Sequence, residues 1–135
     1  MGQQQLLLII LGVIVVGIAV AVGITMFQDN AVSANRDAVT NDLVNLASRA
    51  QQFYRRPQAL GGGGNSFVGL TANAAGLAKL TSKSANANGS YAITTAGTTA
   101  TVVLQGTGVE KGTDGNPISI TMSVFPDSTY VSQAN

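Results

Sequence analysis

The chain has 135 residues, with seven Lys and Arg against six Asp and Glu, which gives a formal net charge of +1. This balance excludes the strongly basic composition of a nucleic-acid-binding domain. The chain also has no His and no Cys, which removes the commonest general base and metal ligand together with all thiolate chemistry. The composition therefore favours a structural or binding protein over an enzyme. We expect no cofactor, no nucleic acid and no small-molecule substrate.

The first element is an uncharged apolar run, Leu6–Phe27 (LLLIILGVIVVGIAVAVGITMF). As a helix its 22 residues extend about 33 Å, which is enough to cross the hydrocarbon core of a membrane. The run is too long for a typical signal-peptide core and no Ala-x-Ala cleavage site follows it, so we expect it to be retained. Residues 1–27 are predicted as an apolar half-helix that serves as a membrane span or as the core of a filament.

Three glycines, Gly12, Gly17 and Gly23, interrupt this run. Each costs a helix about 1 kcal/mol relative to Ala. The favoured explanation is close packing of helices, because small residues let backbones approach. The alternative is a helix that unwinds locally among its copies. The residues expected to form the filament core are Gln5, Leu6, Leu7, Ile10, Gly12, Val13, Val16, Gly17, Val20, Gly23, Ile24 and Phe27.

The next segment, residues 28–56, continues the helix with an amphipathic pattern. One apolar stripe at helical spacing joins Val32, Val39, Leu43, Leu46, Ala50 and Phe53. No proline or glycine interrupts the chain from Ile24 to Arg56, and Pro57 supplies a stop. We therefore predict a single helix from about residue 2 to residue 56. Its packing residues Val39, Leu43, Leu46, Ala50 and Phe53 are expected to face sheet residues Ile93, Val102, Leu104, Ile120 and Met122.

Residues 57–65 (PQALGGGGN) form a sharp break in composition. Four consecutive glycines indicate a flexible connection or one with positive φ angles. A phosphate-binding loop is excluded, because no Gly-Lys-Ser/Thr follows and no strand precedes the glycines.

Residues 66–135 are predicted as a small globular β domain. Period-two patterns and β-branched residues indicate strands over Ser90–Thr95, Ala100–Gln105 and Ile118–Phe125. We expect a tight hairpin at Ala96-Gly97 and a longer turn over 106–117. A three- or four-stranded antiparallel sheet over about 88–132 would be stable when packed on the helix stripe. The predicted fold class is α+β, with the apolar half of the helix protruding and the amphipathic half packed on the sheet.

This layout resembles the type IV pilins and pseudopilins, and the local stretch Ala50–Leu70 (AQQFYRRPQALGGGGNSFVGL) resembles pilin-like proteins of bacterial surface filaments. The resemblance implies a structural subunit that polymerises into an extracellular helical filament. The apolar helices would bundle into its core and the sheets would form its outer wall. The implied partners are copies of the chain itself, after insertion in the inner membrane. The family usually has Glu at the fifth position of the mature chain. Gln5 stands there if that chain begins at Met1, and Leu7 stands there if cleavage follows Gly2.

Two further functions are compatible with this sequence. One is a monomeric surface domain anchored by a single membrane span and presenting its sheet for binding. The other is a pseudopilin of a secretion machine. A separate hypothesis concerns Gln5, which with Gln3 and Gln4 either sets the register of neighbouring helices by hydrogen bonds or only caps the helix. Gln5→Leu separates these two roles, because only a register role predicts few or irregular filaments.

Overall fold

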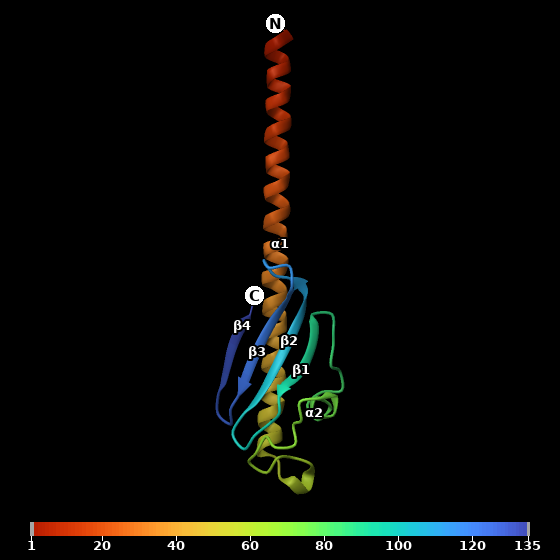
Figure 1. Ribbon diagram of the computed structural model, residues 1–135, viewed down its shortest axis with the longest axis vertical. Helices are drawn as coiled ribbons and strands as arrows, with labels where there is room; N and C mark the ends of the chain where they lie inside the picture. The colour runs from red at the N-terminus through yellow and green to blue at the C-terminus, as the bar shows by residue number, and fades with distance from the viewer. Residues whose placement is uncertain (1, 135) are drawn as a thin grey trace.

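The computed structural model describes residues 2–134 as one long helix carrying a small sheet (Figure 1). Met1 and Asn135, the outermost residues of the expected first and last segments, lie outside the described residues. Helix α1 (Gly2–Arg55) is followed by a 3-10 turn, η1 (Gln58–Leu60), and a short helix, α2 (Ala74–Ala78). Four strands complete the chain: β1 (Gly89–Thr95), β2 (Val102–Lys111), β3 (Pro117–Val124) and β4 (Thr129–Ala134). They form an antiparallel sheet in the order β1-β2-β3-β4, which confirms the α+β fold class.

The core lies between the C-terminal half of α1 and the inner face of the sheet. Five residues of the helix stripe are buried here: Val39, Leu43, Leu46, Ala50 and Phe53. The sheet residues expected opposite them are buried in the same cluster: Ile93, Val102, Leu104, Ile120 and Met122. Burial alternates along β2 and β3 with the period of two that one covered face of a sheet requires. The core is closed by residues from position 39 onward.

The connection between β1 and β2 differs from the expected tight hairpin at Ala96-Gly97. β1 ends at Thr95 and β2 begins at Val102, so six residues separate the two strands. The turn of this loop lies farther along the chain, where Thr98 N donates to the carbonyl of Thr101 at 2.7 Å. The loop also bonds to a distant segment: Gly97 N donates to the carbonyl of Leu70 at 2.8 Å, and Phe67 N donates to that of Thr98 at 2.9 Å. The prediction of a two-residue turn was wrong because these distant partners hold the loop open.

The predicted turn over 106–117 is also too long. β2 continues to Lys111, so only residues 112–116 join β2 to β3. The glycines that suggested a turn lie in the strand where it crosses α1. A Cβ on Gly106 would lie 2.6 Å from Val39 Cγ1, and one on Gly108 would lie 2.2 Å from Asn35 Oδ1. Glycine is required here by the close approach of strand and helix.

The glycine-rich connection folds back onto the end of α1. Gly63 N donates to the carbonyl of Phe53 at 2.8 Å, Gly64 N to that of Arg56 at 2.9 Å, and Asn65 N to that of Tyr54 at 2.7 Å. The φ angles of Gly61, Gly64 and Asn65 are +79°, +58° and +63°. The last carbonyls of a helix have no partner within the helix, and these amides satisfy two of them, at Phe53 and Tyr54, together with the carbonyl of Arg56 just beyond the helix.

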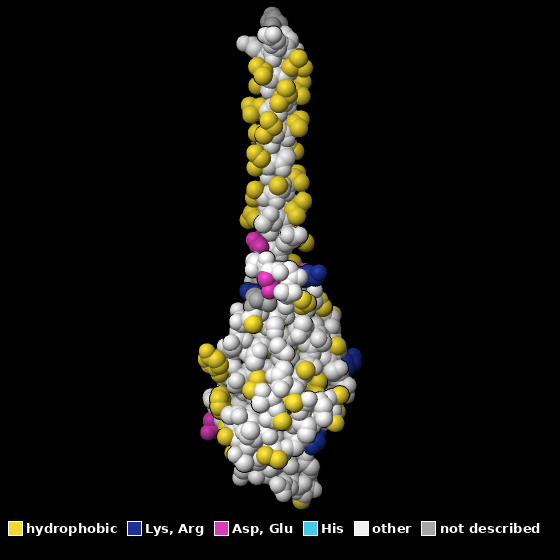
Figure 2. Space-filling view, in the orientation of Figure 1, with side chains coloured by type: hydrophobic (Ala, Val, Ile, Leu, Met, Phe, Trp, Pro, Cys, Tyr) yellow, Lys and Arg dark blue, Asp and Glu magenta, His cyan; other side chains and the backbone are white. Residues whose placement is uncertain are grey.

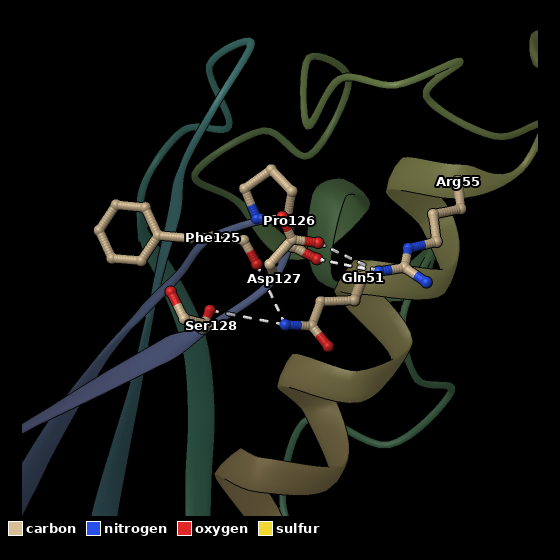
Figure 3. Close-up of polar contacts among 6 residues, drawn as sticks. All are labelled: Gln51, Arg55, Phe125, Pro126, Asp127 and Ser128. Atoms are coloured by element: carbon tan, nitrogen blue, oxygen red, sulfur yellow. Dashed lines mark hydrogen bonds and ion pairs between the residues drawn. The ribbon is translucent and has the colours of Figure 1, made fainter.

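A second set of contacts ties the last turns of α1 to the turn between β3 and β4 (Figure 3). Gln51 Nε2 donates to the carbonyl of Phe125 at 3.1 Å, and Arg55 Nη2 lies 3.3 Å from Asp127 Oδ1. The side chains of this ion pair are 68% and 90% exposed, so the pair itself adds little stability. The hydrogen bond from the Gln51 amide to the half-buried Phe125 is the firmer link.

Candidate functional site

The most unusual surface of the molecule is the N-terminal half of α1, residues 2–27, here called the stalk. Its large apolar side chains are between 52% exposed, at Ile14, and 75% exposed, at Phe27. Figure 2 shows apolar side chains along the whole stalk and charged ones only below it. Contiguous apolar surface of this extent marks a contact with protein or lipid. The stalk is therefore the candidate functional site.

All the predicted filament-core residues, from Gln5 to Phe27, lie in the stalk and are exposed. The structure does not set them apart from their neighbours on the other sides of the helix, since Leu8 and Ile18 are exposed to 67% and 61%. A helix that is apolar on every face is usually surrounded on every side by protein or lipid. The predicted filament-core residues therefore stay a prediction, because exposure alone does not distinguish one face of the stalk from another.

Within the described chain, the stalk has the composition and the environment of an unpartnered membrane-type helix. α1 is long and apolar enough to cross a membrane, and none of its most apolar window is buried within the molecule. Gly12, Gly17 and Gly23 lie within continuous helix, and a Cβ built on any of them meets no atom within 4 Å. The three positions leave room for a neighbouring backbone.

The junction between the stalk and the globular part, residues 28–134, contains a hollow of about 440 Å³. Its lining comes from α1 and from the end of the β2–β3 hairpin: Gln28, Val32, Val109, Glu110, Lys111 and Gly112. We call it the collar hollow. Val109 is 59% exposed and Val32 is half-buried, so an apolar surface lies among polar and charged groups.

Asn35 fixes the wall of the collar hollow. Its Nδ2 donates to the carbonyl of Asn88 at 2.8 Å, and its Oδ1 accepts from the backbone N–H of Glu110 at 3.2 Å. The side chain is 9% exposed, and a buried amide with both partners satisfied holds the hairpin against α1. Sequence reasoning missed Asn35, although it occupies the stripe between Val32 and Val39 at helical spacing.

A second hollow, of about 350 Å³, lies lower on the domain between α1 and the loop before β1, and Asp42, Arg49 and Lys83 contribute to its lining. Burial raises the pKa of Asp42, but hydrogen bonds from Asn88, Tyr91 and Asn86 together hold it below its ordinary value. Within residues 2–134, no group of three His, Cys, Asp or Glu side chains is placed to hold a metal ion. The hydrogen bonds of Asp42 join α1 to Asn86, Asn88 and Tyr91. We call these four residues the clasp.

The amino-acid sequence and the fold were also compared with known proteins. The chain matches no family model, no curated protein and no solved structure.

Proposed function

We propose that the chain is a pilin, the structural subunit of an extracellular helical filament on the bacterial surface, and that it polymerises through the stalk. The supporting observation is the contrast between the two halves of α1. The globular part closes its own core with residues from Val39 onward, whereas the stalk contributes no buried residue. Each square ångström of apolar surface removed from water is worth about 25 cal/mol. The stalk must therefore be covered by other molecules, either further copies of the chain or lipid.

A filament provides that cover better than a closed pair of copies. One partner covers one side of the stalk. The apolar side chains lie on every side, because the consecutive residues Leu6–Leu11 are all exposed and span more than one helical turn. A bundle with all stalks at one level would leave their outward faces in water. Copies displaced along the axis place the globular part of one copy over the stalk of another. Such a contact joins two different surfaces and does not close, so it continues as a helical polymer.

The membrane is the second environment that covers an apolar helix on all sides. α1 is compatible with insertion, and we place the chain in the inner membrane before assembly. A permanent monomeric anchor that presents the sheet for binding is the alternative function. Transient polymerisation as a secretion pseudopilin is a further variant. The membrane anchor and the pseudopilin differ from a pilin in location, because only a pilin accumulates in filaments outside the cell.

Electron microscopy of sheared surface material tests the proposal. We expect thin fibres that antibodies to the globular part label along their length. Val16→Asp, in the stalk, should abolish the fibres, because an unpaired carboxylate among apolar helices is costly. Val44→Asp is the matched control, because Val44 lies on α1 with 47% exposure in the globular part. Recovery of the unmodified chain only as a detergent-extracted monomer would contradict the proposal.

A further inference from the structure

We propose that η1, at the end of the molecule farthest from the stalk, docks in the collar hollow of a second copy one stalk length along the filament. The inference rests on the proposed polymerisation and specifies its longitudinal contact. The surface we call the tip is Gln58–Leu60 together with Pro57, all exposed. Leu60 is 71% exposed, and the backbone that follows α1 forms the end of the molecule opposite the N-terminus (Figure 1).

The two surfaces lie at opposite ends of the globular part. The tip follows the C-terminal end of α1, while the collar hollow includes Gln28 and Val32 at the base of the stalk. The α1 segment between Val32 and Arg55 alone spans about 35 Å at 1.5 Å per residue. A tip and a hollow at opposite ends cannot meet within one chain. Between chains they form a head-to-tail contact that repeats without closing.

The surfaces are also complementary in character. The collar hollow presents the apolar side chains of Val109 and Val32 inside a polar rim that includes Glu110 and Lys111. Leu60 supplies an apolar group to cover Val109, and the amide of Gln58 can donate to Glu110. Asn35 holds the hairpin wall in place before docking. A preformed receiving surface of this kind lowers the ordering cost of association.

The lengths of the two halves of α1 support the same displacement. The stalk comprises residues 2–27 and the remainder of α1 comprises residues 28–55, which correspond to about 39 Å and about 42 Å. A copy displaced by about 40 Å toward the stalk end therefore lays its globular part along the whole stalk of the first. The side of the stalk that faces this copy is then covered over its full length.

The ends of the stalk provide an independent indication of the same displacement. Gln3, Gln4 and Gln5 are exposed amides that precede the apolar run, and Gln28, Asp29 and Asn30 follow it. Gln4 and Asp29 are 25 residues apart, or about 37 Å along the helix. A displacement of this size brings the glutamines of one copy level with the polar residues of the next. An intermediate displacement sets the amides against apolar side chains, where they lose their hydrogen bonds.

Cysteine pairing tests the contact directly, because the chain has no cysteine of its own. The full-length double variant Leu60→Cys/Val109→Cys is assembled under reducing conditions and then oxidised. A disulfide needs Cα atoms within about 7 Å, so these positions can be joined only between copies. We expect a ladder of dimers, trimers and longer species on a non-reducing gel, because each copy carries one tip and one hollow.

The control is Tyr130→Cys/Val109→Cys. Tyr130 on β4 is 66% exposed, close to the 71% of Leu60. Disulfides formed by this control therefore measure random collision between copies. A ladder from the tip pair well above this control supports the docking. Fibres visible by microscopy with no ladder above the control overturn the docking while leaving polymerisation intact. Failure of the unmodified chain to form fibres overturns the proposed function and the docking together.

A charge placed at the tip provides a second measurement. Leu60→Asp should raise the concentration needed for assembly by at least about tenfold, since it sets a carboxylate against Val109 and Glu110. Val68→Asp is the control, at 58% exposure outside the tip. Both exposed substitutions should leave the thermal unfolding of the globular part unchanged. Equal assembly of the two variants would contradict docking at the tip.

Discussion

The phenolic hydroxyl of Tyr91 on β1 donates a hydrogen bond to Oδ2 of Asp42 on α1. The same oxygen accepts from Asn86 Nδ2 at 2.8 Å and from Asn88 Nδ2 at 2.9 Å. Burial and the neighbouring carboxylate raise the pKa of Tyr91 above its ordinary value, so the hydroxyl keeps the proton that it donates. One carboxylate oxygen on the helix thus holds both the first strand and the loop that leads into it.

Removing the Tyr91 hydroxyl should weaken this clasp without disturbing the core. The ring of Tyr91 is only 6% exposed and stays in place in Tyr91→Phe. We expect the free energy of unfolding to fall by about 1.5 to 3 kcal/mol, the range for a hydrogen bond to a charged group. Urea denaturation in mild detergent measures it. Tyr130→Phe, on the exposed β4 strand, should have no effect, and equal losses in the two variants would contradict the role of the clasp.

The same cluster predicts how stability depends on pH. The hydrogen bonds hold the pKa of Asp42 below its ordinary value despite its burial, so the unfolded chain takes up the proton first as pH falls. The stability that the carboxylate contributes is therefore complete above about pH 4, the unfolded value, and is lost as pH falls through the folded-state pKa. Asp42→Asn removes this contribution. The difference in unfolding free energy between the unmodified chain and Asp42→Asn should narrow below about pH 4, and a constant difference would contradict the assignment.

The stripe of α1 predicts a sharp contrast between adjacent positions. Leu43 is fully buried against the sheet, whereas Val44 is 47% exposed. Leu43→Asp should unfold the globular part, because an unpaired buried carboxylate costs several kcal/mol. Val44→Asp should retain cooperative melting. Circular dichroism with a thermal ramp distinguishes them, and a normally melting Leu43→Asp variant would show that the packed face is wrong.

The glycines of β2 predict that even a methyl side chain at these positions lowers the free energy of unfolding. A methyl group on Gly108 would lie 2.2 Å from Asn35 Oδ1 and 3.0 Å from Ile118 Cγ1. Gly108→Ala should therefore cost about 1 to 3 kcal/mol as helix and strand separate. Gly17→Ala, in the stalk, meets nothing within 4 Å and should leave the melting of the globular part unchanged. Chemical denaturation of the two variants gives the comparison, and an unaffected Gly108→Ala would show that β2 can move away from α1 at little cost.

These glycines also show which part of the fold could not be predicted from the amino-acid sequence. The helix, its stripe and the alternating strands could be predicted, because each pattern reports on residues close together in the chain. Gly106 and Gly108 were assigned to a turn, since glycine has the same local signature in a turn and at a close crossing of backbones. Val39 and Asn35, which require glycine there, lie about seventy residues earlier in the chain.

The candidate site shows the same difference between local patterns, which could be predicted, and contacts between distant segments, which could not. The stalk was identifiable from composition alone, but the collar hollow was not, because it combines Gln28 and Val32 of the helix with Val109 of the distant β2–β3 hairpin. Leu60 stood in a predicted connection and gave no signal of its own. Its position at one end of the molecule becomes meaningful only once the fold places the collar hollow at the other.

Polymerisation through the stalk is tested most directly by comparing the full chain with one that begins at Gln28. Both are brought out of detergent under the same conditions, and sedimentation with electron microscopy measures what assembles. The full chain should pellet as fibres. The shortened chain should remain a monomer with an unchanged melting temperature, since the core begins at Val39 apart from the Asn35 contact. A full chain that stays monomeric, or a shortened chain that forms the same fibres, would contradict the claim that the stalk drives assembly.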